Sequence, residues 1–227
     1  MSIYLCVLDF EATCWNDEHK DNSIKTKYKQ EIIEFPSVLY ELTMDGEVKY
    51  IEEFSKYVRP VLEPMLSKFC TELTGITQDK VDSAEPIEIV YEQHHQWLNS
   101  NTRLGDPIYI ITCGAWDLDI MLPKEVHNKN LPYYSVYKRF INIKTEFENV
   151  YKVKAGGMVN MLNYLNIPLE GRHHSGIDDT RNIAKILLKI ISDGHVNFDI
   201  TQKTINDKNK DDKKRIQIKN NKNKNRK

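Results

Sequence analysis

The sequence has few cysteines and no long apolar stretch, and both absences narrow the class of protein. Its 227 residues contain four cysteines, none of them spaced as a C-x-x-C pair. Disulfide-rich folds and zinc sites depend on such patterns, so we expect neither, and we expect an intracellular, reducing compartment, cytoplasmic or nuclear. No apolar stretch reaches the roughly 20 residues that a membrane-spanning helix needs, so no membrane partner is predicted.

The motifs of several enzyme classes are also missing. The sequence contains no P-loop and no G-x-G-x-x-G fingerprint, and no Ser/His/Asp triad stands out. The first two motifs bind nucleotide phosphates, and the third supplies a covalent nucleophile. Any chemistry must therefore come from another set of residues.

The sequence has little net charge, but its positive charge is concentrated at the C-terminal end. The formal net charge is −1, yet residues 203–227 carry eleven lysines and arginines against three aspartates, a net charge of +8. Few of these residues are apolar, so we expect a disordered basic tail at 201–227 after a single domain at 1–200. The tail either attracts polyanions through counterion release or is a solvated segment without a role. Only the first interpretation predicts that deleting 203–227 weakens the binding of a polyanionic partner and flattens its salt dependence.

The apolar pattern predicts an α/β fold. Strands are expected at residues 3–10, 31–43, 47–60, 107–114 and 139–147. Helices are expected at residues 66–76, 87–98, 116–126, 157–167 and 178–192. Asp45-Gly46 marks a hairpin turn, and Ser67 and Gly75 cap a helix. Pro36 predicts an interruption or an exposed stretch in its strand, and Pro123 is expected to interrupt or end its helix. This order of elements predicts a mixed sheet flanked by helices.

Two acidic residues follow the first predicted strand. Asp9 and Glu11 are two positions apart, so their side chains project to the same side. Two like charges that are partly desolvated raise each other's pKa unless a cation lies between them. The pair therefore suggests a metal site, although two acids that point into solvent at the end of a sheet would have the same pattern.

Two further acids and a histidine lie at the ends of other buried elements. Asp117 begins a helix after a buried strand, where it is either a metal ligand or an acid that suits the helix dipole. Asp179 lies four residues before Ile183 and shares the apolar stripe of the last helix, where a charge needs a partner. His174 lies on the lead-in to that helix, where a lone histidine would otherwise be an ordinary polar side chain.

These five residues together suit one type of chemistry. Ligands that are all oxygen favour hard cations, so we expect two Mg²⁺ ions as cofactors, with Mn²⁺ able to substitute. Two such ions, about 3.5–4 Å apart, form the clamp that is used for in-line displacement at phosphorus. A histidine beside them fits the general base that activates the attacking water.

The same residues resemble the signature of the DEDDh 3′–5′ exonuclease family, which is DnaQ-like with a ribonuclease-H-like fold. The four acidic letters and the histidine are Asp9, Glu11, Asp117, Asp179 and His174. The blocks "LDFEATC", "EIIEFPSVL", "FCTELTGIT", "TCGAWDLDIMLP" and "RHHSGIDDTRNIAKI" look like the Eri-1-type branch, whose members trim RNA ends. The resemblance covers about residues 3–199 and implies a mixed five-stranded sheet flanked by helices in a single domain.

The resemblance also implies a role for each residue. Asp9 would bridge the two ions, Glu11 and Asp179 would complete the first site, and Asp117 would serve the second. His174 would take the proton from the attacking water, so Glu11 and His174 are the expected catalytic residues. The residues implied to bind the terminal nucleotide are Glu11, Ala12, Thr13, Leu73, Thr74, Trp116 and His174. For Trp116, a place in the core is the alternative.

We therefore expect a metal-dependent 3′–5′ exoribonuclease that acts on single-stranded 3′ ends or 3′ overhangs of RNA. Its products would be nucleoside 5′-monophosphates. One alternative is a 3′–5′ exonuclease directed at DNA. Another is a catalytically idle module that binds nucleic acid or a protein. The complete set of acids favours an enzyme over the idle module.

Overall fold

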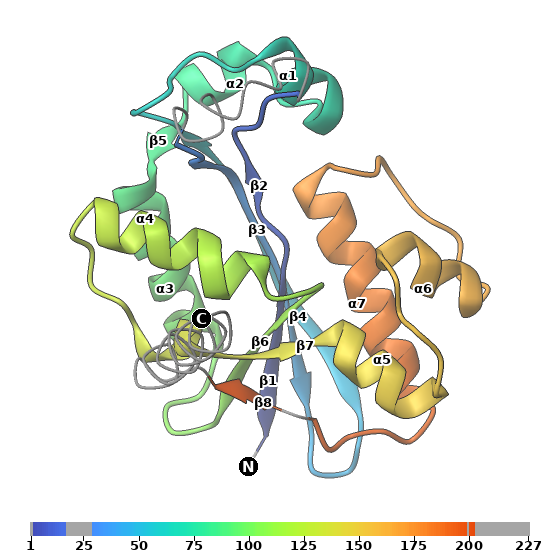
Figure 1. The fold of residues 1–227 in the computed structure, drawn as a ribbon. Coiled ribbons are helices and arrows are strands. Elements are labelled where there is room, and N and C mark those ends of the chain that lie inside the picture. The colour runs from blue at the N-terminus through green and yellow to red at the C-terminus, as the bar shows by residue number, and fades with distance from the viewer. Residues whose placement is uncertain (1, 17–28, 199, 203–227) are drawn as a thin grey trace, which may run out of the picture.

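A mixed β-sheet with helices on both faces organises the residues that the computed structural model describes, 2–16, 29–198 and 200–202 (Figure 1). The strands are β1 Ile3–Leu8, β2 Glu11–Ala12, β3 Ile32–Leu42, β4 Val48–Arg59, β5 Glu85–Pro86, β6 Ile108–Thr112, β7 Arg139–Asn142 and β8 Ile200–Gln202. The α-helices are α1 Lys68–Thr74, α2 Gln78–Asp82, α3 Ile87–Asn101, α4 Leu122–Asn128, α5 Ile143–Tyr151, α6 Met158–Tyr164 and α7 Gly176–Ser192. A π-helical segment, Asp117–Met121, precedes α4, and a 3₁₀ turn, Ser135–Lys138, precedes β7.

The strand order confirms the predicted mixed sheet and corrects its size. The order is β5-β4-β3-β1-β6-β7-β8, and β2 pairs with β3 beyond the end of β1. β1 lies between an antiparallel neighbour, β3, and a parallel neighbour, β6. Each of the five strands of four or more residues falls within a predicted strand, but the strand predicted at 139–147 is wrong in its second half. It ends at Asn142, whose side chain accepts a hydrogen bond from the N–H of Lys144, and residues 143–147 begin the helix α5. β2, β5 and β8 extend the sheet to eight strands. These short strands have only two or three residues, which is too few for a recognisable period.

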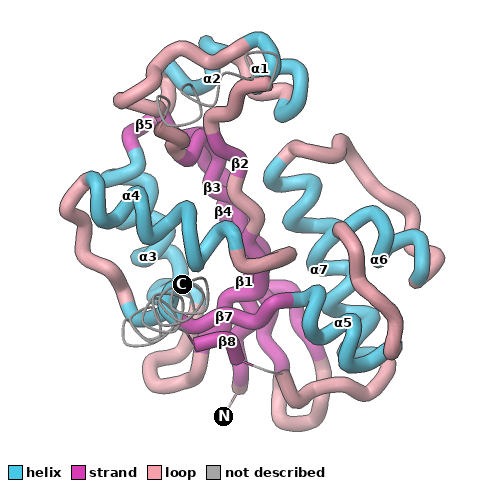
Figure 2. The backbone as a smooth tube through the Cα atoms, viewed as in Figure 1, coloured by secondary structure: helices cyan, strands magenta, loops and turns pink. Residues whose placement is uncertain are grey.

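Two apolar clusters fill the space between the sheet and its two helical layers. Figure 2 shows α3 and α4 on one side of the sheet and α5, α6 and α7 on the other. β1 supplies Cys6 and Leu8 to the first cluster and Leu5 and Val7 to the second. Successive side chains of a strand point to opposite faces, so this central strand is buried on both sides.

The predicted hairpin and the predicted helix caps are confirmed. β3 and β4 pair along their length, and Gly46 in the turn between them has a φ of 81°. At the start of α1, Ser67 Oγ accepts a hydrogen bond from the backbone N–H of Cys70 at 2.9 Å. At its end, Gly75 adopts the left-handed conformation with a φ of 74°. These features depend on residues close together in the chain.

The prediction that β3 is interrupted or exposed at Pro36 is wrong. Pro36 is buried within a continuous strand and pairs with Ser55 of β4. On the other side, the pairing of β1 with β3 ends at Ser37, and the pairing of β2 begins at Glu34. Pro36 therefore faces the gap between β1 and β2. A residue without a backbone N–H is tolerated where no strand pairs with it on one side.

Pro123 does not break its helix either. The π-helical segment that begins at Asp117 continues directly into α4, and Pro123 is the second residue of α4. A missing N–H is tolerated in the first turn of a helix. The expected interruption is replaced by a change of helix type, and π-helical turns are common at functional sites.

The basic tail that the sequence predicts lies outside the described residues from residue 203 onward. The proposed contribution of the tail to RNA binding therefore stays a prediction. Among the described residues, every helix is too short or too polar to cross a membrane.

Candidate active site

The carboxyl end of β1 brings three acidic side chains together. Asp9 follows β1 directly, Glu11 begins β2, and Asp179 lies in the first turn of α7, which packs against β1 and β3. One carboxylate oxygen from each residue lies within 4.8 Å of the oxygens from the other two. Glu11 and Asp179 are buried and Asp9 is half-buried. Three segments that are distant in the sequence therefore converge, and we call Asp9, Glu11 and Asp179 the acidic trio.

Asp117 is bonded to the backbone of the segment that carries Asp9 and Glu11. It is the first residue of the π-helical segment and is buried. Its Oδ1 accepts a hydrogen bond of 3.0 Å from the backbone N–H of Phe10. Because Phe10 lies between Asp9 and Glu11, this bond fixes Asp117 against the segment that carries both residues.

Burial raises the pKa of all four acids, and the charges of neighbouring acids raise those of Asp9 and Glu11 further. For Asp9, burial comes first, followed by the charges of Asp117, Glu11 and Asp179, and its pKa lies well above the ordinary value. Burial is also the main cause of the raised pKa of Glu11, about 8, and of Asp117, about 6. The pKa of Asp179 is raised for the same reason. A cation among these oxygens would favour their charged forms and reverse the effect.

The donor atoms fit a divalent cation. Asp179 Oδ2 accepts a hydrogen bond of 2.9 Å from the backbone N–H of His174. Its Oδ1, in contrast, is buried and has no hydrogen-bond partner among the described residues. A buried carboxylate oxygen without a partner is costly unless a cation binds it. Since the acidic trio offers only oxygen ligands, a hard divalent cation suits it best.

His174 lies beside the acidic trio on the turn that leads into α7. Its φ is 66°, a left-handed conformation that residues other than glycine seldom adopt. Strain of this kind is common at functional sites, where the surrounding contacts maintain it, and the bond to Asp179 does so here. Burial lowers the pKa of His174, and the charges of His173 and Arg172 lower it further. Its ring is therefore neutral, and able to accept a proton, near neutral pH.

His173 is close enough to be a second candidate base. Its ring stacks on that of His174 with 3.9 Å between the centroids. Its Nε2 lies 3.9 Å from Asp179 Oδ2. His173 is the more exposed of the two histidines, and the backbone bond to Asp179 belongs to His174. His174 is therefore the better-placed residue.

Glu34 is a residue of this site that sequence reasoning missed. It is buried on β3 and accepts hydrogen bonds from the backbone N–H groups of Gly176, at 3.0 Å, and Ile177, at 3.2 Å. The N-terminal end of a helix favours such a negative charge. Glu34 thereby holds the end of α7 that carries Asp179. The sequence did contain a signal for Glu34, because it is an acid within an otherwise apolar strand. The same kind of signal had singled out Asp9 as a candidate site residue.

The residues expected to bind the terminal nucleotide lie on two elements that touch each other. The Cys70 thiol of α1 lies 3.8 Å from the carbonyl oxygen of Ala12 on β2. Leu73 and Thr74 at the end of α1 therefore lie at the same end of the sheet as Ala12 and Thr13. The hydroxyl of Thr13 accepts a backbone N–H just before β3, and that of Thr74 donates to a carbonyl within α1. Both hydroxyls thus have partners inside the protein.

Trp116 precedes Asp117 directly and is half-buried. It packs against the apolar cluster beneath α3 and α4. This packing agrees with the alternative of a core tryptophan, while part of the side chain stays accessible next to Asp117.

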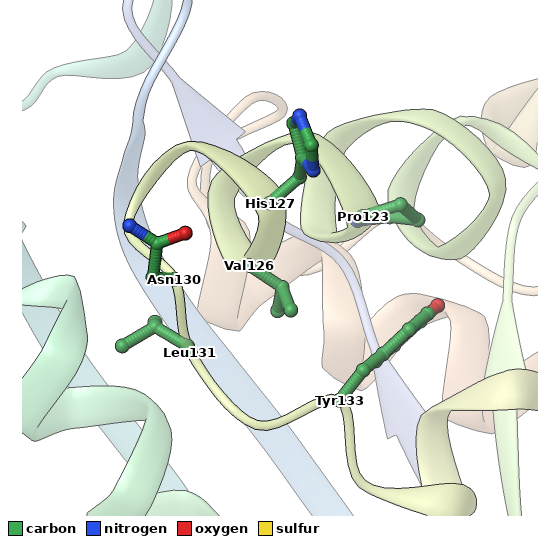
Figure 3. Close-up of a pocket in the computed structure, with 6 residues that line it drawn as sticks. All are labelled: Pro123, Val126, His127, Asn130, Leu131 and Tyr133. Atoms are coloured by element: carbon green, nitrogen blue, oxygen red, sulfur yellow. The ribbon is translucent and has the colours of Figure 1, made fainter.

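A separate surface pocket of about 430 Å³ lies on α4 and the loop that follows it (Figure 3). Its lining residues are Pro123, Val126, His127, Asn130, Leu131 and Tyr133. None of the acids described above lines this pocket, so it is distinct from the candidate active site.

Comparison with known proteins decides the family. A family model described as Exonuclease matches residues 6–187. A crystal structure of the nuclease domain of 3′hExo, a DEDDh family member bound to rAMP, is 35% identical in sequence. It superimposes with a TM-score of 0.78 and covers 88% of this chain and 97% of that chain. This chain belongs to the DEDDh exonuclease family, in its Eri-1-type branch. DEDDh exonucleases depend on divalent metal ions, which agrees with the acidic trio.

Curated relatives of this DEDDh exonuclease extend the comparison. The 3′–5′ exoribonuclease 1 of Rattus norvegicus is 38% identical over 84% of this chain and 54% of its own length. The 3′–5′ exonuclease Snipper of Drosophila melanogaster is 32% identical over 88% of this chain and 73% of its own length. The chain spans about half the length of the rat protein and less of several other relatives.

Proposed function

We propose that this protein is a metal-dependent 3′–5′ exoribonuclease that releases nucleoside 5′-monophosphates from the 3′ end of RNA. The observation that carries the proposal is the convergence of the oxygens of Asp9, Glu11 and Asp179 within 4.8 Å of one another, beside His174. RNA as the substrate is supported by the likeness to proteins named exoribonuclease and to a structure bound to rAMP.

Two Mg²⁺ ions, or Mn²⁺ in their place, are the proposed cofactors. Asp9 would bridge them, Glu11 and Asp179 would complete the first site, and Asp117 would serve the second, partly through water. When bound, such ions offset the charge of the phosphodiester and lower the pKa of a bound water. The protein contributes rigid placement, because Asp117 is held by the backbone of Phe10.

His174 is the proposed general base. Its ring nitrogen takes the proton of the attacking water while the new bond from oxygen to phosphorus forms and the bond from phosphorus to the 3′ oxygen of the preceding nucleotide breaks. The 3′ oxygen takes up a proton from solvent and becomes the new 3′-hydroxyl end of the shortened RNA. The phosphate stays on the 5′ oxygen of the released nucleotide. The lowered pKa of His174 keeps the ring neutral, and the backbone bond to Asp179 fixes its location.

The terminal nucleotide is proposed to lie between β2 and the end of α1. Ala12 and Thr13 would line one side, and Leu73 and Thr74 the other, with the accessible part of Trp116 nearby. Apolar and aromatic contacts of this kind tolerate any base, which suits an enzyme that removes successive nucleotides.

A degradation assay tests the proposal. A single-stranded RNA labelled at its 5′ end is incubated with the protein and Mg²⁺, and the products are resolved by length. We expect progressive shortening from the 3′ end, release of 5′-monophosphates, and complete inhibition by a chelator. An RNA that carries a 3′-phosphate in place of the free 3′-hydroxyl is a second substrate, on which cleavage should be slower.

Three outcomes would contradict the proposal. Shortening that persists in Asp9→Ala would remove the role assigned to that residue. Faster degradation of a single-stranded DNA of the same sequence would identify a DNA-directed exonuclease. Binding of RNA without cleavage under Mg²⁺ or Mn²⁺ would identify an idle binding module.

A further inference from the structure

Arg172 connects two parts of the candidate active site that are far apart in the chain. It lies two residues before His174, and its side chain reaches the C-terminal end of α1. There its Nη2 donates hydrogen bonds to the carbonyl oxygens of Glu72, at 2.5 Å, and Leu73, at 3.2 Å. Carbonyl groups in the last turn of a helix have no partner within the helix, and a cation there also suits the helix dipole.

The end of α1 is shaped to receive this guanidinium. A Cβ atom added at Gly75 would lie 1.6 Å from Nη1 of Arg172. Gly75 also has a φ of 74°, in the left-handed region that favours glycine. Glycine at this position therefore ends the helix and leaves the space that the arginine side chain fills.

The backbone on the other side of Arg172 is fixed to α7. Its N–H donates to Asp178 Oδ2 at 3.0 Å, and its carbonyl oxygen accepts from the N–H of Ser175 at 3.1 Å. Two residues further on, the N–H of His174 donates to Asp179 Oδ2. The turn that carries His174 is thus held to α7 by its backbone and to α1 by the Arg172 side chain.

We propose that Arg172 is a positioning residue whose side chain sets the distance between His174 and the end of α1 with Leu73 and Thr74. The inference rests on the proposed function, in which α1 holds the terminal nucleotide and His174 acts at its phosphodiester. Both must act on one bound molecule at the same time, so a displacement of about 1 Å between them lowers the rate of the chemical step. Arg172 itself does not contact the reacting atoms.

Steady-state kinetics of Arg172→Ala on single-stranded RNA give the first test. We expect kcat to fall roughly 10–100-fold, the range found for residues that orient catalytic groups, while KM changes less than about threefold. Arg172→Lys keeps the charge but has no planar fork to bridge two carbonyl groups, so it should restore only part of kcat. Arg103→Ala is the matched control, because that exposed arginine pairs with Glu41 at 3.3 Å near the start of β1, at the opposite end of the strand.

The salt dependence separates positioning from direct binding of RNA. An arginine that neutralises an RNA phosphate contributes to the slope of log KM against log salt, and its loss lowers that slope by about 1. A positioning residue leaves the slope unchanged. A reduced slope with kcat intact in Arg172→Ala would therefore overturn the proposal.

Gly75→Ala disturbs the same contact from the other side. Its added Cβ displaces the guanidinium, so we expect a loss of kcat similar to that of Arg172→Ala and no further loss in the double variant. Gly46→Ala controls for backbone strain, because Gly46 has a φ of 81° and a Cβ there meets nothing within 4 Å. Losses that multiply in the double variant would show that the two residues act independently.

Hydrogen exchange of the metal-free protein tests the link that the Arg172 side chain forms between α1 and the His174 turn, and it requires no RNA cleavage. In Arg172→Ala we expect faster amide exchange in both connected segments, 72–76 and 172–176. Faster exchange in 72–76 alone would mean that the arginine merely caps α1, and the proposal would fall. This measurement tests the role of Arg172 even if the wild-type protein degrades no RNA. A failure of the proposed nuclease function can therefore be told apart from a failure of the proposed link between α1 and the His174 turn.

Discussion

Glu31 and the acidic trio are buried or half-buried acids at the same end of the sheet, but different groups surround them. Glu31, just before β3, accepts hydrogen bonds from the backbone N–H groups of Val61, Leu62 and Glu63. It also forms an ion pair with Lys129 at 3.0 Å. Burial by itself would raise the pKa of Glu31, but these donors outweigh it and the pKa is lowered.

The acidic trio has the opposite surroundings. The carboxylate oxygens of Asp9, Glu11 and Asp179 lie within 4.8 Å of one another. Burial raises the pKa of all three, and repulsion from the other acids raises those of Asp9 and Glu11 further. A buried acid that the protein supplies with donors stabilises the fold. A buried acid surrounded by other acids needs a cation from outside, and this difference separates a structural carboxylate from a functional one.

Removing an acid from the trio should produce the largest effect. Asp9→Asn is expected to lower RNA degradation on the order of 10⁴-fold, because Asp9 is the proposed bridge between two ions that each contribute several kcal/mol. The melting temperature in chelator should stay the same or rise, because one of the repelling charges is gone. A clear loss of stability in Asp9→Asn would contradict the distinction from Glu31.

His174→Ala is expected to lower kcat roughly 10²–10⁴-fold, the usual contribution of a general base. For the wild type, the rate should fall as the pH drops through the pKa of His174, which burial places below the ordinary value of 6.5. That acidic limb should disappear in the variant. His173→Ala is the control, and a larger loss there would move the base to His173.

Substitution of Glu31 should lower the stability of the protein and leave its activity unchanged, the opposite of what we expect for Asp9. Glu31→Gln removes a charge from three backbone donors and Lys129, so we expect the free energy of unfolding to fall by about 2–3 kcal/mol. Urea denaturation measures that loss. The kcat of the folded protein should be unchanged, and a large fall in kcat would mean that Glu31 takes part in the chemistry.

The smallest expected effect is the change with pH in the stability of the metal-free protein. The pKa of Glu11 is about 8 in the folded protein against 4.5 ordinarily. Its protonated form therefore stabilises the fold fully below pH 4.5, and this stability is lost as the pH rises through about 8. Melting temperatures in chelator should fall across that window. Mg²⁺ should reduce the fall and release protons at pH 7, because binding requires charged carboxylates. Glu11→Gln should release fewer protons.

Features that depend on neighbours in the chain could be predicted from the sequence. Asp45-Gly46 sets the hairpin, Ser67 and Gly75 bracket α1, and the apolar stripe of the last helix already assigns Asp179 to the inner face. The apolar runs also indicated that Asp9 and Asp117 each follow a buried strand. These predictions need only local conformational preferences and the periods of helix and strand.

Features that depend on distant partners could not be predicted in the same way. Pro36 is tolerated only because β1 and β2 leave a gap beside it. Glu34 bonds to Gly176, which is 142 positions away, and Arg172 bonds to Glu72, which is 100 positions away. Nothing in the local sequence indicates such partners, since each contact exists only after the sheet and its helices have packed.

The close packing of α7 against the sheet at Gly176 has a consequence for how DEDDh exonucleases are recognised from sequence. A Cβ atom at Gly176 would lie 3.0 Å from Glu34 Oε2, 3.0 Å from Pro36 Cγ and 3.1 Å from the carbonyl oxygen of Asp9. A side chain there would require one of these neighbours to shift by a few tenths of an ångström. In this chain, an exchange of Gly176 would therefore affect the placement of Asp179 although every signature letter would still be present. A search for the five letters alone does not detect this contact.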